Sequence, residues 1–327
     1  LFDGGRMFLA KSRLGAEEGV AAGRLKASVE NTVSTTLGAY FDVVRLQQSL
    51  RVLEGAIGIT EERVRLAQAR FETGAASKLD LLQAKVDLDA RRSDLARLRI
   101  THETAMARLN EIMGVPEFRT FTATDTIRLD YPTVDAREVA ALLERNSEVR
   151  IGREQLRAST NRIGEARAGA WPRLVAGLGY GTARTENDFG TLLHSRSTGV
   201  NGSLALTWNL FDGWSNATQV TRARLQASSS QATLDQTLSR VRQQCIVARH
   251  RYVTDRDIVG MEQDMLELAR ENVTVAMEAY RAGSISGLQL REAENSYEQA
   301  LERSIAARYQ AKLSETELMR ITGDLVK

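Results

Sequence analysis

Apolar residues return every three or four positions over unusually long stretches of this chain. From residue 6 to residue 71 no proline interrupts this spacing, which includes Val33, Val44, Leu53 and Val64. Such spacing predicts a single helix of about 66 residues, which at 1.5 Å per residue would be about 100 Å long. The same pattern predicts further helices over residues 78–113, 135–168, 215–280 and 288–322.

A period of two replaces this pattern between residues 172 and 211. Apolar side chains occupy alternate positions over 200–210, as in a strand with one apolar and one polar face. A partner strand over 174–184 alternates apolar residues with Gly177, Gly179 and Gly181. Each strand is about ten residues long, the length of a tilted strand that crosses a bilayer. We therefore expect a membrane hairpin with a long polar loop over 185–198, although a soluble hairpin with one hydrophobic face would give the same alternation.

Aromatic residues favour the membrane alternative. Trp171 precedes the first strand, Trp208 lies near the end of the second, and Phe211 and Trp214 follow it. An antiparallel hairpin brings these residues to the same end, and tryptophan prefers the boundary between lipid headgroups and hydrocarbon. A single hairpin cannot close a barrel, so the remaining strands must come from residues before Leu1 and from other subunits.

Glycine-containing turns separate the helices. Residues 72–77 and 281–287 form short turns around Gly74 and Gly283, where glycine can end one helix and a following serine can cap the next. Residues 117–133 have no clear period and contain Pro132, so we expect a linker with one short strand at 126–129.

The chain contains an internal duplication. LFDG occurs at residues 1–4 and again at 210–213, and a constant offset of 209 relates many later residues. A period of this length excludes the common solenoids, whose units span about 20 to 50 residues. We predict a first repeat over 1–114, a linker over 115–133 and a second repeat over 134–323.

The two predicted repeats are unequal. The second copy has a helix and two strands before LFDG, which the first copy lacks, so we expect a strand pair ending in LFDG immediately before Leu1. Any export signal would lie further upstream.

Composition excludes several classes of function. Lysine and arginine number 44 against 42 acidic residues, so no strong positive charge attracts nucleic acid. Cys245 is the single cysteine, and its apolar surroundings indicate a core position. The histidines, His102, His194 and His250, lie far apart without metal-binding spacing. We therefore expect no catalytic site, no metal and no cofactor. No run of 18 apolar residues predicts a membrane-spanning helix.

The order of short motifs resembles that of the TolC-like outer-membrane efflux proteins. Besides the two LFDG segments, the chain carries FETG at 71–74, YRAG at 280–283, LDLLQA at 79–84 and LQLREA at 288–293. Each motif is weak alone, but together their order, spacing and duplication are specific. The resemblance covers essentially all 327 residues.

This resemblance implies a fold, a location and a set of partners. The fold would be mostly α with a membrane β-hairpin: a homotrimer whose long antiparallel helices form an α-helical barrel across the periplasm, continuous with a 12-stranded β-barrel in the outer membrane of a Gram-negative bacterium. It implies a passive exit duct for substrates driven by an inner-membrane transporter through a periplasmic adaptor protein. Residues 115–133 would belong to a belt around the helical barrel.

The resemblance also implies a constriction at the periplasmic tip. By position, Asp80 matches a constricting aspartate and Tyr280 a linking tyrosine, while Gln289 and Glu292 stand where the family's type member has aspartates. Ile285 stands where that member has a linking arginine. In a trimer, carboxylates facing the lumen would form rings that favour cations. Alternatively, Asp80 and Glu292 are solvated residues near a helix start, where the helix dipole favours carboxylates.

Two other classes of function compete with a channel. Long helices joined by a tight turn also suit a soluble coiled-coil structural or adaptor protein of the cell envelope, although the alternating residues around Trp208 argue against this. An enzyme would need an acid-base, metal-binding or phosphate-binding motif, and the sequence contains none.

Overall fold

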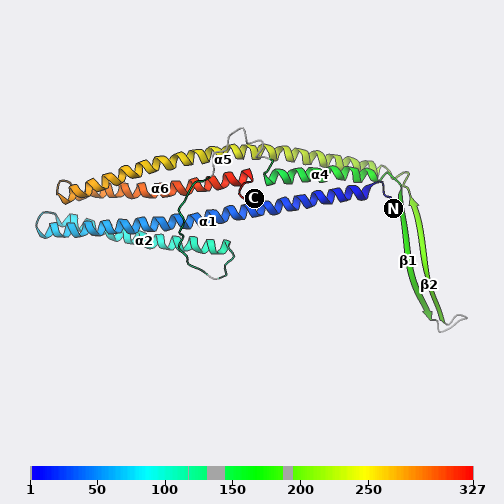
Figure 1. Ribbon diagram of the computed structural model, residues 1–327, viewed down its shortest axis with the longest axis horizontal. Coiled ribbons are helices and arrows are strands. Elements are labelled where there is room, and N and C mark those ends of the chain that lie inside the picture. Colours follow the sequence, from blue (N-terminus) through cyan, green and yellow to red (C-terminus); the bar gives the residue numbers. More distant parts are fainter. Residues whose placement is uncertain (1, 117, 131–143, 187–193, 327) are drawn as a thin grey trace. The chain divides into compact units, whose positions relative to one another are not determined.

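The computed structural model describes residues 2–116, 118–130, 144–186 and 194–326. Its elements are α1 (Arg6–Glu72), α2 (Lys78–Ile112), α4 (Ser147–Ala168), β1 (Arg173–Glu186), β2 (His194–Thr207), α5 (Ser215–Arg281) and α6 (Gly287–Thr322) (Figure 1). The predicted class, mostly helical with long antiparallel helices and one β-hairpin, is confirmed. The chain divides into unit 1 (Leu1–Ala27 and Ser147–Arg240) and unit 2 (Ser28–Asn146 and Val241–Lys327), so that α1 and α5 run through both.

The duplication extends to local backbone geometry. Asp3 and Asp212, 209 positions apart, each accept a hydrogen bond from the backbone N–H four residues later, at 3.0 Å and 2.7 Å. These carboxylates satisfy N–H groups that the start of a helix leaves without a backbone partner. The last turns of α2 and α6 are followed by Gly114 and Gly323, with φ of 67° and 75°. Corresponding aspartates therefore cap the first long helix of each copy, and corresponding glycines follow its return helix.

In unit 1, α4 packs against the first parts of α1 and α5 through small residues. A Cβ added to Gly23 of α1 would lie only 2.8 Å from Cγ1 of Ile151 on α4. On the side toward α5, the hydroxyl oxygens of Ser159 and Ser230 are 2.8 Å apart. The small side chains allow close approach of the helices, which is what a layer without large core residues requires.

The hairpin of unit 1 buries neither of its faces. The antiparallel register pairs Leu178 with Gly202 and Tyr180 with Val200, so the apolar side chains of both strands share one face. The other face carries small residues, and a Cβ added to Gly179 would lie 2.6 Å from Oδ1 of Asn201 across the strands. All of β2 is exposed, and residues 173–185 of β1 are exposed or partly exposed. Within the residues that the structure describes, neither face of the hairpin is covered.

The strands differ in length from the prediction. Residues 185–186 and 194–198, assigned by hydropathy to the loop, are paired as strand, whereas β2 ends at Thr207 instead of residue 210. The centre of the predicted loop lies outside the described residues. Polar residues continue the ladder because pairing uses backbone groups, whatever the side chains are. At the other end, the indole N–H of Trp208 donates to the Ala170 carbonyl at 3.2 Å, outside the ladder.

In unit 2, narrow apolar contacts join the helices. Two clusters connect α1 with α2, one of Val43, Met106 and Leu109 and the other of Ala67, Leu81 and Ala84. The counterparts of Leu81 and Ala84 in the second repeat, Leu290 and Ala293, are also buried on α6. Cys245 on α5 is buried as predicted. Each helix thus contributes a stripe of buried apolar residues, as their spacing of three and four positions in the sequence indicated.

Residues 118–130 run between α1 and α6 without helix or strand. The Gln47 side chain donates to the Ala123 carbonyl at 3.1 Å and accepts from its N–H at 3.0 Å. Oε1 of Glu315 on α6 accepts from the Asp130 N–H at 2.7 Å. The short strand predicted at 126–129 is therefore wrong: side chains of the helices, and no second strand, bind the backbone of this segment.

The third predicted helix starts later than expected. Residues 144–146 are not helical, α4 begins at Ser147, and most of the predicted first turns lie outside the described residues. The Asn146 side chain donates to the carbonyl of Ile321, near the end of α6, at 2.9 Å. This contact holds the chain in a turn where the apolar spacing alone predicted a continuous helix.

Candidate functional site

The return helices α2 and α6 begin with the same capping box. The Oγ of Ser77 accepts from the Asp80 N–H at 3.2 Å, and the Asp80 carboxylate accepts from the Ser77 N–H at 3.2 Å. In the second repeat, Ser286 and Gln289 make the same two bonds at 3.3 Å and 2.9 Å. Two of the predicted constriction residues, Asp80 and Gln289, thus hold the first turns of their helices.

The tip turns place an arginine against the predicted linking tyrosine. Gly74 and Gly283 have φ of 76° and 77°, a conformation that glycine adopts without steric cost. The Arg70 guanidinium lies 5.0 Å from the ring centroid of Tyr280, and its Nη1 donates to the Tyr280 carbonyl at 3.3 Å. Arg70 therefore binds both the ring and one of the last carbonyls of α5, where a cation is favoured by the helix dipole.

A cavity of about 300 Å³ lies beside these turns in unit 2. Asp80 and Tyr280 both line it, so the structure brings together two of the four predicted constriction residues. Gln289 and Glu292 are not among its lining residues, and Glu292 is exposed on α6. Three further charged side chains line the cavity: Arg63, Asp87 and Arg291.

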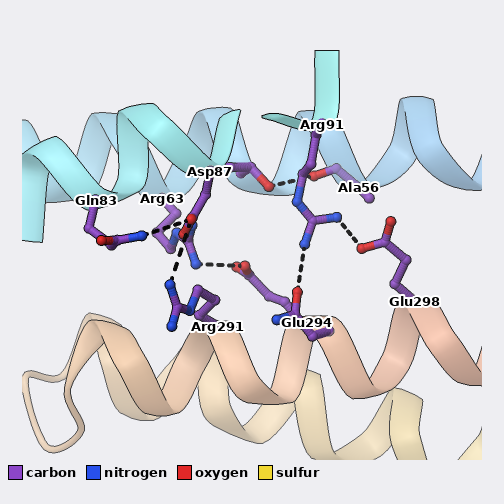
Figure 2. Close-up of polar contacts among 10 residues, drawn as sticks. Ala56, Arg63, Gln83, Asp87, Arg91, Arg291, Glu294 and Glu298 are labelled. Carbon is purple, nitrogen blue, oxygen red and sulfur yellow. Dashed lines mark hydrogen bonds and ion pairs between the residues drawn. The ribbon is translucent and has the colours of Figure 1, made fainter. Parts of the chain in front are cut away.

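Arg63 connects three helices from a buried position. Its Nη2 donates to Oδ2 of Asp87 on α2 at 2.5 Å, and its Nη1 donates to Oε2 of Glu294 on α6 at 3.0 Å (Figure 2). The side chains of Arg63 and Glu294 are each only 4% exposed. Charge-assisted bonds in such surroundings are strong and directional. Helices of the first and second repeats are therefore joined through one guanidinium.

A second arginine extends this network along α6. Arg91 on α2 donates to the Glu298 carboxylate and, at 3.1 Å, to Oδ1 of Asn295. Nη1 of Arg291 lies 3.7 Å from Oδ1 of Asp87. Figure 2 shows the Arg291 side chain pointing toward this carboxylate. Three arginines thus face three carboxylates, and their formal charges cancel. We call this set the charge network: Arg63, Arg91, Arg291, Asp87, Glu294 and Glu298.

The charge network is not fully satisfied by hydrogen bonds. Within the described residues, Nε of Arg63 and Oε1 of Glu294 are buried without a hydrogen-bond partner. Burial raises the pKa of Glu294, although Arg63 and Arg91 oppose this effect. In a low-dielectric site, removing any member of a partly satisfied network is expected to lower the stability of the protein strongly.

Neither Arg63 nor Arg70 was among the functional residues predicted from the sequence. A usable signal existed for Arg63, because it continues the buried stripe of Thr60 and Ala67 on α1 at steps of three and four. The hydropathy pattern does not include Arg63 among the buried positions, because its side chain is charged. Its partner Glu294 is 231 positions away, so spacing alone could not pair them.

The predicted interface aromatics lie exposed at the helical end of the hairpin. Trp171, Trp208, Phe211 and Trp214 are each more than half exposed. Trp214 has φ of 69°, a left-handed conformation that costs a bulky residue about 1 to 3 kcal/mol. Its counterpart in the first repeat is Gly5, with φ of 79°. An exposed tryptophan at a position suited to glycine supports a role outside packing, and the membrane-interface assignment stays a prediction.

Two features are absent from the described ranges. No helix there has a stretch long and apolar enough to span a membrane. No group of three or more histidine, cysteine, aspartate or glutamate side chains there could hold a metal ion.

Comparison with known proteins gives one family. A family model described as "Outer membrane efflux protein" matches residues 1–115 and 139–324. Protein CyaE of Bordetella pertussis is 26% identical over 244 residues, which are 72% of this chain and 50% of CyaE. The outer membrane efflux protein BepC of Brucella suis is 22% identical over 99% of this chain and 70% of its own length. The chain thus spans only half to 70% of these relatives.

The solved structure of the outer-membrane channel OprN has a similar fold. Its TM-score is 0.80 at 20% sequence identity, and the alignment covers 98% of this chain and 72% of OprN. At this identity the likeness concerns the fold alone.

Proposed function

The chain belongs to the outer membrane efflux protein family, and we propose that it forms a passive exit duct through the outer membrane. Membership places it among channels and not among enzymes, in agreement with the sequence analysis. In this proposal, substrates are driven by an inner-membrane transporter and reach the duct through a periplasmic adaptor protein.

The exposed hairpin carries this proposal. Its strands are 14 residues long, one face is apolar, and neither face is covered within the described chain. Two strands with open edges cannot remain unpaired in hydrocarbon. We propose that three chains combine their strands, together with those expected before Leu1, into a 12-stranded barrel. The apolar face of Leu178 and Tyr180 would contact lipid, and the face of Gly179 would line the lumen.

The helices of unit 2 would form the periplasmic part of the duct. We propose that Asp80, Tyr280, Gln289 and Glu292 lie near its constriction, where the tip turns bring the helix ends together. Ile285 lacks the charge of the linking arginine that the resemblance implies at this position. In this chain Arg70, which stacks on Tyr280, would supply that arginine from the opposite helical hairpin.

Conductance in planar lipid bilayers tests the function. The purified protein is expected to insert from detergent and to produce discrete current steps. A matched variant that lacks residues 173–207 should keep its helical circular dichroism and produce no steps. A protein that remains in solution without detergent and never conducts would contradict the duct and favour the coiled-coil alternative.

Single-channel recording on Asp80→Asn tests the carboxylate ring. Asparagine keeps an oxygen that can accept the Ser77 N–H, so the capping box survives while the charge is lost. The preference for cations over anions is expected to fall several-fold, because three carboxylates would leave the lumen together. The control is Glu72→Gln, which removes an exposed carboxylate at the end of α1. Unchanged selectivity in Asp80→Asn would leave this residue with its capping role only.

A further inference from the structure

An exposed apolar stripe follows the second half of α5. It consists of Ile258, Met261, Met265, Leu268 and Val275, which are 39% to 68% exposed. The spacing of three, four, three and seven residues is that of a coiled-coil seam. Buried Tyr252, Val273 and Tyr280 lie on a different face of the helix. The α5 stripe is therefore a second seam, unoccupied within the described chain.

Helix α2 carries another exposed stripe. Leu79, Leu82, Val86 and Ile100 are 49% to 72% exposed, and the first three are separated by three and four residues. The buried contacts of α2 with α1 lie on another face, at Leu81, Ala84 and Leu88. Unit 2 thus presents two seams, on α2 and on α5, that can each accept a helix.

Opposite charges flank the two stripes at a spacing of seven residues. The basic row on α2 consists of Lys78, Lys85, Arg92 and Arg99, and the acidic row on α5 consists of Asp257, Asp264, Glu271 and Glu278. None of the four acids forms an ion pair within the described part of the chain. In coiled coils, flanking charges of this kind select the partner and its orientation.

The two rows also match in height above the tip. Counted from Ser77, the members of the basic row are residues 1, 8, 15 and 22; counted back from Arg281, those of the acidic row are 3, 10, 17 and 24. The constant difference of two residues is about 3 Å along a helix. The ends of α1 and α5 lie level within one chain, since Arg70 and Tyr280, two and one residues before Glu72 and Arg281, are in contact. The ends of α1 and α2 also lie level, since Arg63 and Asp87 meet at nine and ten residues from Glu72 and Ser77. Four pairs would therefore align together.

Both rows lie on the same side of an antiparallel helix pair. At about 100° per residue, the basic row lies about 95° to one side of the α2 stripe, and the acidic row about 80° to the corresponding side of the α5 stripe. Seen from the tip, residue angles increase clockwise around one helix of an antiparallel pair and counterclockwise around the other. When the two stripes face each other, rows that lie at similar angles from their own stripes therefore lie on the same side of the pair. The rows consequently meet when α2 and α5 run in opposite directions.

We propose that the stripe and basic row of α2 bind the stripe and acidic row of α5 in a second copy of this chain. The inference rests on the proposed trimer and names the faces that would build it. The two faces differ, so the contact is heterologous and can close into a ring. Complementary charge and equal heights favour a second copy over an unrelated partner.

Part of the basic row already has partners within the chain. Arg92 pairs with Glu61 at 2.9 Å and Arg99 with Glu54 at 3.2 Å, and these pairs are exposed. Lys78 and Lys85 form no ion pair within the described residues. The tip half of the row is therefore free to bind the second copy, opposite Glu278 and Glu271.

Charge reversal tests the contact. In the full chain in detergent, Lys78→Glu with Lys85→Glu is expected to weaken trimer association about tenfold per interface, because each exposed pair contributes a factor of about 2 to 5. Glu271→Lys with Glu278→Lys should do the same, and the four changes together should restore association. Arg270→Glu, an exposed change outside the row, is the matched control. Mass is measured by analytical ultracentrifugation, and helix content by circular dichroism.

Each outcome bears on a separate statement. Restoration in the fourfold variant supports the contact. Loss without restoration, or no loss in a trimeric protein, overturns these faces while leaving the trimer intact. A wild-type protein that is monomeric in detergent overturns the trimer and this inference together. If reversal unfolds the chain, the neutral variants Lys85→Gln and Glu271→Gln are compared with Arg270→Gln, and equal association of all three overturns the contact.

Discussion

Replacing Arg63 with methionine is expected to lower the free energy of unfolding by about 3 to 5 kcal/mol, because it leaves the buried Glu294 carboxylate without its direct counter-charge. Glu294 would lose its direct ion pair, and Asp87 would keep the hydrogen bond from Gln83 and the longer ion pair with Arg291. Methionine fills much of the volume of the arginine stem, so the loss is mainly electrostatic. The measurement is urea denaturation followed by helical circular dichroism in detergent.

The matched control is Arg65→Met, two residues away on the same helix. Arg65 is 70% exposed in its pair with Glu62, and exposed pairs contribute about 0 to 1 kcal/mol. The double variant Arg63→Met with Glu294→Met removes both buried charges and should recover much of the loss. Equal destabilisation by Arg63→Met and Arg65→Met would show that the charge network does not hold these helices together.

Replacing Leu178 with arginine is expected to impair membrane insertion by about 2 to 4 kcal/mol, the cost of an arginine on the lipid face near the middle of a bilayer. Leu178 is 85% exposed on the apolar face of the hairpin, and its neighbour across the strands is Gly202. No side chain in that pair could shield the new charge. Folding into lipid vesicles over a guanidinium series measures the effect.

Asn201→Arg is the control for the opposite face. Asn201 pairs with Gly179, and its Oδ1 lies over the position that a Cβ of Gly179 would occupy. A charge on a face that lines water should change insertion by less than about 1 kcal/mol. If Leu178→Arg and Asn201→Arg insert equally well, the apolar face does not contact lipid.

Local chemistry made several features predictable from the sequence. Ser77 and Ser286 begin helices because a hydroxyl can accept the orphan N–H groups of the first turn, and this depends only on residues three positions apart. The faces of the hairpin follow from alternation, because successive side chains point to opposite sides of a strand. The motif order also led to the efflux family that the family model confirms.

Features that depend on distant residues escaped prediction. The segment at 126–129 has residues compatible with a strand, but Gln47 and Glu315 bind the neighbouring backbone from two helices. The ends of the strands were also not predicted, because backbone pairing continues through polar residues that the hydropathy pattern assigns to the loop. The proposed role of Arg70 as the linking arginine, whose position in the family's type member is held here by Ile285, required Tyr280 to be located in space.

The sequence by itself determined α1, α2, α5 and α6, the duplicated turns and the family, because each depends on near neighbours or on motif order. Only the tertiary structure decided that Arg63 meets Asp87 and Glu294, and that the charged rows of α2 and α5 lie level. A charged residue on a long helix has many partners compatible with its spacing. Burial and the alignment of the helix ends select one of them.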